Sequence, residues 1–173
     1  MFGLKTILQI RDDLHSIIKA EGRDLTFKNI IWGIFGLDAF IILMLFRIRK
    51  AAVALHIPFV NRFLRGLTLA CYGLELGIDV ELGTGVNFVH STGTVVGGKA
   101  SIGPRTKLYG CNTVGTAKEN GEPEIGADVI IGAGARVLGP IEIGHGTIIG
   151  ANAVVLYTCP SHSKLMGIPA KAQ

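Results

Sequence analysis

The chain has 173 residues, of which 49% are hydrophobic and 17% charged, with 24 glycines and a net charge of +4. This length suits one ordinary domain with a short extension, and the apolar content excludes an intrinsically disordered protein. The glycines show no three-residue period, which excludes collagen. The three cysteines are far apart and odd in number, so we expect reduced thiols in a cytosolic protein and no metal site.

The positive charge is concentrated in the first part of the chain. Residues 1–75 hold ten Lys or Arg and six Asp or Glu, whereas residues 76–173 hold seven of each. The basic excess is not interleaved with aromatic residues and carries no known nucleic-acid motif. We therefore predict no nucleic-acid binding.

Residues 1–75 follow a helical pattern and are expected to form an N-terminal helical domain. Apolar residues recur at three-to-four spacing between Leu4 and Ile18, which predicts an amphipathic helix. Thr26 is a candidate cap for a second helix that runs through Phe46. A third helix is expected from Val53 to Leu69, with a bend near Pro58 because proline breaks the hydrogen-bond ladder.

The run from Ile30 to Phe46 is almost entirely apolar, with Asp38 in its middle, and no secretory signal is evident before it. Five basic residues and no acid follow Asp38 before Leu74. One interpretation is a helical domain whose apolar faces pack against each other. The other is peripheral association of residues 30–65 with the inner face of a membrane. Asp38 favours the first interpretation, because a charge is costly in lipid.

From residue 76 onward the period changes to six, and residues 76–173 are expected to form a second domain. Aliphatic residues stand six apart in two runs that are separated by a loop at Thr116–Glu124, and a small residue usually follows each of them. The runs are Val96, Ile102, Leu108 and Val114, and then Ile125, Ile131, Val137, Ile143, Ile149 and Val155. Neither a helix nor an alternating strand has this period. It predicts a solenoid in which short strands stack coil upon coil and the aliphatic residues point inward.

Three segments carry a resemblance to a known family. Val86–Gly97 contains His-Ser-Thr-Gly from His90, Ile131–Gly144 is glycine-rich, and Gly167–Lys171 reads Gly-Ile-Pro-Ala-Lys. Together they resemble the serine O-acetyltransferases among the hexapeptide-repeat acyltransferases. The resemblance implies an α+β fold, with helices followed by a left-handed parallel β-helix, and a homotrimer with active sites between subunits.

The same resemblance implies acetyl transfer from acetyl-CoA to a hydroxyl, with His90 as the general base. Asp79, in a Gly-Ile-Asp-Val motif, is the expected partner of His90, although its spacing from His90 is about four residues shorter than in the family. The simpler interpretations are a solvent-exposed corner histidine and a turn acid. The residues expected to contact the cosubstrate fall into three groups. Gly115 and Thr116 are candidates for a backbone N–H that stabilises the thioester carbonyl. Gly132, Ala133, Gly150 and Ala151 are expected along the pantetheine, and Lys164 and Lys171 at the phosphates of CoA.

Two candidate substrate positions depart from the family. Val89 stands where the serine enzymes have an acidic substrate contact, and Glu122, after Gly121, stands where they have an Arg and a His. These departures argue against serine as the acceptor. The altered pattern resembles that of serine-acetyltransferase-like enzymes that O-acetylate sugars, and this resemblance implies a sugar hydroxyl in polysaccharide biosynthesis as the acceptor. Serine O-acetyltransferase is the first alternative, and a non-catalytic hexapeptide scaffold is the second.

Overall fold

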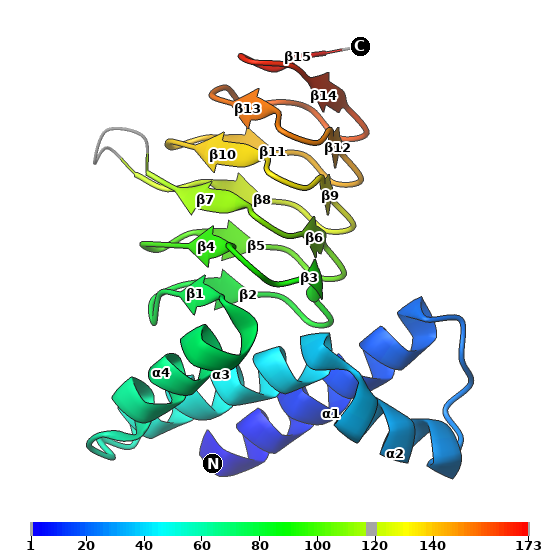
Figure 1. Cartoon of the computed structure of the whole chain (residues 1–173), viewed down its shortest axis with the longest axis vertical. Helices are drawn as coiled ribbons and strands as arrows, with labels where there is room; N and C mark the ends of the chain where they lie inside the picture. Colours follow the sequence, from blue (N-terminus) through cyan, green and yellow to red (C-terminus); the bar gives the residue numbers. More distant parts are fainter. Residues whose placement is uncertain (1, 117–120, 173) are drawn as a thin grey trace.

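A computed structural model describes residues 2–116 and 121–172. Four helices lie together at one end of a stack of short strands, and the strands rise away from them coil by coil (Figure 1). This arrangement confirms the expected α+β class with a β-solenoid of parallel sheets. The first strand begins at Glu75, directly after the helical region.

The helical region has more breaks than the apolar pattern predicts. Helix α1 spans Phe2–Ala20, and α2, Phe27–Gly36, begins after Thr26, whose side-chain oxygen accepts a hydrogen bond from the Asn29 N–H. The expected single helix from Thr26 to Phe46 is wrong, because the extended residue Leu37 ends α2 and starts α3, Asp38–Ala54, with a bend of 75°.

The expected third helix is also divided. Helix α3 ends at Ala54, and α4 spans Val60–Tyr72. Between them, His56 and Phe59 adopt positive φ angles on either side of Pro58. Proline has no N–H to donate, and it disfavours helical geometry at the residue before it. A full break therefore replaces the expected bend.

The strands form three sheets, one on each side of a triangular coil. Sheet A has the order β1-β4-β7-β10-β13, sheet B has β11-β8-β5-β2, and sheet C has β15-β14-β12-β9-β6-β3. All pairs are parallel except β14 with β15. The bounds are β1 Glu75–Leu76, β2 Glu81–Leu82, β3 Asn87–His90, β4 Val95–Val96, β5 Ser101–Ile102, β6 Lys107–Tyr109, β7 Thr113–Gly115, β8 Glu124–Ile125, β9 Ile130–Ile131, β10 Arg136–Leu138, β11 Glu142–Ile143, β12 Ile148–Ile149, β13 Val154–Val155, β14 Lys164–Met166 and β15 Lys171–Ala172.

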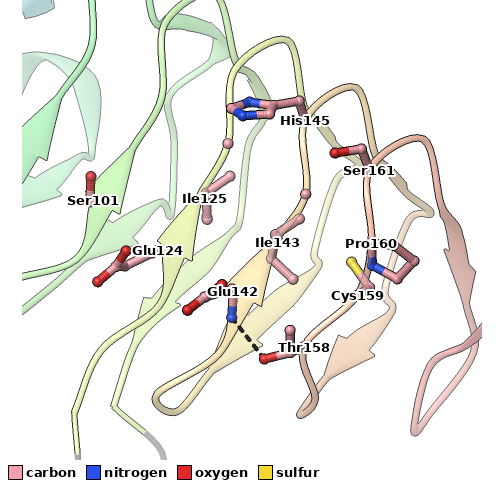
Figure 2. Close-up of a pocket in the computed structure, with 12 residues that line it drawn as sticks. Ser101, Glu124, Ile125, Glu142, Ile143, His145, Thr158, Cys159, Pro160 and Ser161 are labelled. Carbon is pink, nitrogen blue, oxygen red and sulfur yellow. Dashed lines mark hydrogen bonds between the residues drawn. The ribbon is translucent and has the colours of Figure 1, made fainter.

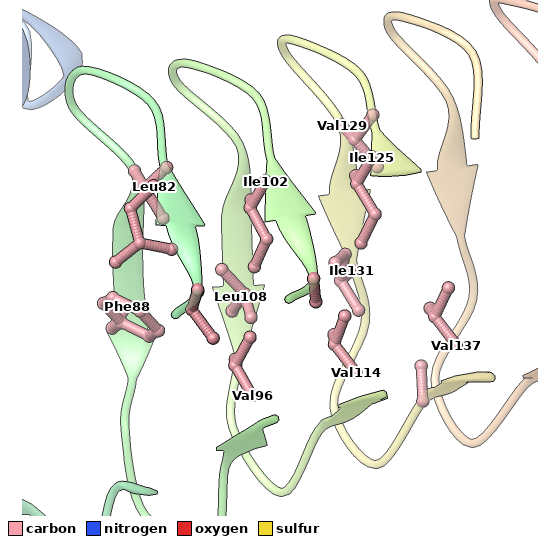
Figure 3. Packing of buried hydrophobic residues seen from close by; sticks show 14 of the residues in the cluster. Leu82, Phe88, Val96, Ile102, Leu108, Val114, Ile125, Val129, Ile131 and Val137 are labelled. Atoms are coloured by element: carbon pink, nitrogen blue, oxygen red, sulfur yellow. The ribbon is translucent and has the colours of Figure 1, made fainter. Parts of the chain in front are cut away.

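The solenoid core consists of the residues that the six-residue period predicts. All ten of the predicted aliphatic positions are buried, each at most 4% exposed, and they stack from coil to coil (Figure 3). The loop after β7 leaves this stack unbroken, because Val114 pairs with Val137 on the far side of it; residues 117–120 of the loop lie outside the described residues. Full burial of each such side chain is worth about 1.5–3 kcal/mol.

The first coil is two residues longer than the second, since Leu76 pairs with Val96 whereas Val96 pairs with Val114. One residue of the extra length is taken up at a bulge between Phe88 and His90, and the other between His90 and Val95. Phe88 therefore fills the inward position of this side, and His90 is exposed. For this reason His90, six residues before Val96, is not one of the inward residues of the six-residue period.

Basic residues of α3 fasten the helical region to the first coil. The buried Arg47 donates from Nη1 to the carbonyl oxygen of Leu82 (2.8 Å) and pairs through Nε with Asp13 of α1 (3.0 Å). Asp13 also accepts a hydrogen bond from the Gly85 N–H (2.9 Å). The side chain of Arg47 thus joins two helices to β2.

Arg49 and Lys50, the next basic residues of α3, make the same kind of contact with the first coil. Arg49 Nη2 donates to the Leu76 carbonyl (3.2 Å), and Lys50 Nζ donates to the Val80 carbonyl (3.0 Å). Burial is the main cause that lowers the pKa of Arg49, followed by repulsion from Arg65. These carbonyls belong to the open edge of the first coil, so α3 supplies donors that no further strand provides.

Membrane association through residues 30–65 finds no support in this arrangement. Helix α3 buries its apolar face within the protein, at Phe40, Ile42, Leu43 and Phe46. The basic residues that were expected to face anionic lipid include Arg47, Arg49 and Lys50, which point into the protein instead. No single described helix is long and apolar enough to cross a membrane, and only the bent pair α2–α3 meets that test of length and composition.

Candidate active site

His90 ends β3, at the corner where sheet C turns into sheet A. Its ring contacts Tyr109 of β6 edge to face, with ring centroids 6.4 Å apart and planes at 70°. The Cβ of His90 lies against Gly110, where an added Cβ would be only 3.0 Å away, and Gly110 has a φ of +85°. Among the described residues, the imidazole makes no hydrogen bond, so the Tyr109 ring and the bulge set its position. The sequence interpretation missed Tyr109.

A column of small residues rises from His90 along the same corner. Gly132 and Ala133 occupy this corner one coil above Gly110, and Gly150 and Ala151 occupy it one coil higher. Backbone hydrogen bonds link the successive levels. An added Cβ on Gly132 would lie 2.6 Å from the Ala151 nitrogen, so coil stacking itself requires a small residue there.

The other expected cosubstrate residues are more scattered. Gly115 ends β7 at the corner between sheets A and B, and Thr116 follows it into the loop, so neither lies on the corner of His90. Lys164 begins β14, and Lys171 begins β15, where it pairs with Met166 of β14. Both lysines are exposed, and they lie on the upper strands of sheet C, whose first strand, β3, ends at His90.

The structure does not bring Asp79 to His90 within the chain. Asp79 is exposed in the turn between β1 and β2, at the corner of sheets A and B, and among the described residues it makes no hydrogen bond or ion pair. His90 lies at a different corner of the triangular coil. Glu122 is also remote from His90, because its carboxylate lies against Gly98 beside the A–B corner.

A small hollow of about 160 Å³ lies beside Val89, the residue before His90. It is lined by the exposed Val89, by Asn87 and by two carboxylate residues of the helical region, Glu21 and Asp38. Val89 itself carries no charge, but the structure thus places the acidic side chains of Glu21 and Asp38 in the hollow beside it. No local motif marks Glu21 or Asp38, because they reach the hollow through the packing of helices against β3.

A larger groove of about 600 Å³ runs over sheet B and its corner with sheet C (Figure 2). Glu124 and Glu142 face outward on neighbouring strands there, and His145 Nδ1 accepts a hydrogen bond from the Ala127 N–H (2.8 Å). This groove is on a different side of the coil from His90. Among residues 2–116 and 121–172, no three His, Cys, Asp or Glu side chains are grouped to hold a metal ion.

Comparison with known proteins agrees with this geometry. The family model for bacterial transferase hexapeptide (six repeats) matches residues 122–156. Serine acetyltransferase of Staphylococcus xylosus is 34% identical over 172 residues, which cover 95% of this chain and 76% of that protein. The solved structure of Neisseria gonorrhoeae serine acetyltransferase in complex with serine has a TM-score of 0.84 and 28% identity, and covers 99% of this chain and 73% of that one.

A second solved structure, a serine acetyltransferase in complex with CoA, has a TM-score of 0.82 at 28% identity, and covers 95% of this chain and 69% of that one. The sequence match extends through the helical region as well as the solenoid. The chain belongs to the serine acetyltransferase family of hexapeptide-repeat transferases, and it is an acetyl-CoA-dependent acyltransferase.

Proposed function

We propose that this enzyme transfers the acetyl group of acetyl-CoA to an acceptor hydroxyl, with His90 as the general base. An alcohol is a poor nucleophile at neutral pH, and an imidazole within hydrogen-bond reach can take its proton as the oxygen attacks. The new C–O bond forms, the C–S bond breaks, and the imidazolium returns its proton to the departing CoA sulfur. One observation carries this proposal: His90 is exposed, has no hydrogen-bond partner among the described residues, and directly follows Val89, which lines a hollow.

The column of small residues above His90 is the proposed path of the pantetheine arm. Gly132, Ala133, Gly150 and Ala151 share the corner of His90, so a thin chain laid along them reaches the imidazole. Lys171 and Lys164 on the upper strands are the proposed contacts of the CoA phosphates. Gly115 and Thr116 fit this path less well, because they lie at the other end of sheet A.

Serine is the acceptor that the comparisons favour, in place of the sugar expected from the sequence. The relatives are serine acetyltransferases, and one solved structure contains serine. The hollow beside Val89 supplies the carboxylates of Glu21 and Asp38, which suit an ammonium group. The expectation of a sugar depended on the lack of such groups near His90 in the sequence.

A sugar hydroxyl, as in polysaccharide biosynthesis, is the second candidate. The apolar Val89 stands directly before the base and is 38% exposed, so one wall of the hollow offers no hydrogen bond to an amino acid. Glu122 is turned toward Gly98 and supplies no cation for a carboxylate. These two residues keep the sugar open as a candidate.

A thiol-release assay with acetyl-CoA separates the two acceptors. We expect turnover with L-serine, and we expect Glu21→Gln to raise the KM for serine while leaving that for acetyl-CoA unchanged. Asp24→Asn, a nearby exposed carboxylate outside the hollow, is the matched control. Turnover with sugars but not with serine would favour the second candidate. If no hydroxyl acceptor causes CoA release, the result would favour the second alternative, a non-catalytic hexapeptide scaffold.

The homotrimer and a cytoplasmic location remain proposals. Since Asp79 and His90 occupy different corners of one chain, their pairing requires a second copy. Sedimentation of the full chain tests the trimer. A loss of turnover in Asp79→Asn supports pairing between subunits, and an unchanged rate removes Asp79 from the site.

A further inference from the structure

A second hollow lies between the last turn of α1 and the outward face of sheet C. Its volume is about 360 Å³, which is within the range of small-molecule sites. Ser16, Lys19 and Ala20 line it from the helix, and Asn87 and Lys107 line it from β3 and β6. Gly85, with a φ of +67°, lies so close to the Ser16 hydroxyl that a side chain at residue 85 would collide with it.

Asn87 is the most informative residue of this hollow. Because Phe88 points into the core, the side chain of Asn87 points outward from β3, and the helical region covers it until only 6% remains exposed. Its backbone N–H bonds to the Thr106 carbonyl, but among the described residues its side-chain amide has no hydrogen-bond partner. The amide of Asn87 is therefore available to a ligand in the hollow.

The charges around Asn87 are mainly positive. Lys19 and Lys107 form no ion pair among the described residues, so both ammonium groups are available. Arg105 and Asp128 complete the wall, and Asp128 accepts from Arg105 Nε and Nη2 at 2.7 and 2.6 Å. The C-terminus of α1 adds a partial negative charge of about half a unit, which Lys19 adjoins. The two lysines therefore give the hollow a net positive charge.

We propose that this hollow binds the phosphate group of a small phosphorylated molecule. The available groups are mostly donors: two ammonium groups, the Ser16 hydroxyl and the Asn87 amide. A phosphate offers several acceptor oxygens and negative charge, which matches this set. The remaining volume accommodates an organic portion. The inference concerns binding alone, and it stands whichever hydroxyl receives the acetyl group.

Three molecules could supply such a phosphate: the acceptor, the cosubstrate or a separate effector. Asn87 lines both this hollow and the hollow beside Val89, so a phosphorylated acceptor could extend from one into the other. Inhibition of acetyl transfer by pyrophosphate distinguishes the sources. Competition with the acceptor indicates the first source, competition with acetyl-CoA the second, and a change without competition the third.

Calorimetric titration of the full chain with inorganic phosphate and with pyrophosphate tests the site directly, with chloride at matched ionic strength. We expect saturable binding that Lys19→Gln and Lys107→Gln each weaken by about tenfold. Lys99→Gln makes the same charge change on an exposed corner outside the hollow and is expected to bind like the original chain.

Asn87→Asp, which places a negative charge at the same shape, is expected to abolish binding. Both lysines lie at the surface of the hollow, so their substitution tests the site even if the Asn87 variant does not fold. Absence of saturable binding, or equal affinity in the Lys19, Lys107 and Lys99 variants, overturns the proposal. Phosphate binding in a chain that transfers no acetyl group would sustain this inference while removing the proposed function.

Discussion

The solenoid and the helical region differ in the kind of interaction that stabilises each of them. In the solenoid, equivalent aliphatic residues stack on each other from coil to coil, and each coil adds the same contacts as the one below. The helices have no such repeat. The apolar core of the solenoid continues into α1 and α3, and particular polar contacts are added to it, of which the buried pair of Arg47 with Asp13 is the centre.

The two regions also supply different parts of the candidate site. The solenoid carries His90 and the column of small residues, whereas the helices close the edge of the first coil and supply Glu21 and Asp38 beside it. This difference teaches that chemistry and stability should respond to different substitutions. Four predictions test that division, from the largest expected effect to the smallest.

His90→Ala should remove activity and leave the fold intact. We expect turnover to fall about 10²- to 10⁴-fold, the usual contribution of a general base. Acetyl-CoA affinity should change little, because the imidazole acts on the acceptor. Steady-state kinetics with calorimetry of acetyl-CoA binding measure both quantities. Retention of more than half the activity would exclude His90 from the reaction.

Asp13→Asn should have the opposite effect, because it leaves His90 unchanged and lowers the stability of the fold. Breaking a buried ion pair by removing one charge costs about 3–5 kcal/mol of unfolding free energy, and Arg47 would keep its charge at 5% side-chain exposure. Urea denaturation measures the loss. Asp12→Asn is the matched control, because Asp12 pairs with its neighbour Arg11 at the surface. Its substitution should lower the unfolding free energy by about 0–1 kcal/mol. Equal stability of the two variants would show that the junction is not held by this pair.

Tyr109→Leu should lower turnover about twofold to tenfold, because a ring contact of this kind is worth about 0.5–1.5 kcal/mol. The KM for acetyl-CoA should not move. Tyr109→Phe keeps the ring and should retain the original rate and pH profile. A Phe variant as slow as the Leu variant would point to the hydroxyl instead of the ring.

The smallest effect concerns the exposed pair of Arg105 and Asp128. The hydrogen bond from Arg105 is the main cause that lowers the pKa of Asp128 below its ordinary value of 3.8. A lowered folded-state pKa stabilises the protein above pH 3.8, and the contribution disappears as the pH falls through the folded pKa. Both side chains are more than half exposed, so solvent screening limits the effect to about 0–1 kcal/mol.

Thermal melts of the original chain and Asp128→Asn should therefore differ slightly at pH 7 and converge under more acid conditions. A difference that persists well below pH 3.8 would have another origin. Asp128→Asn changes the solenoid only at an exposed corner. It is therefore expected to change stability the least, in contrast to a substitution in the buried pair of Arg47 with Asp13.

The solenoid core could be predicted from the sequence because each side of the coil has the same length. Its one error arises where that length changes. Counting forward from Leu76 by six gives Leu82 and Phe88, whereas counting backward from Val96 gives His90. Both counts have the right period, and they are reconciled by two extra residues, one at the bulge after Phe88 and one between His90 and Val95.

The site was predictable only in part. His90 is marked by a local motif, so it could be proposed from the sequence. The partners of the site depend on contacts between distant segments. Asp79 is close to His90 in sequence but lies at another corner, whereas Glu21 reaches the hollow beside Val89 from the helical region. No periodicity encodes such contacts, and none marks the break at Leu37 either.

The reversed direction of β15 affects how these molecules behave when crowded. A stack of parallel coils presents, at its last coil, a hydrogen-bonding edge onto which another molecule could add and so extend the stack into a fibre. On sheet C that edge is occupied by β15, which runs antiparallel to β14. On sheet A, Val154 bonds to Gly167 and Ala170 of the same final segment. The final segment therefore limits polymer growth at one end of the molecule, as the side chains of α3 do at the other.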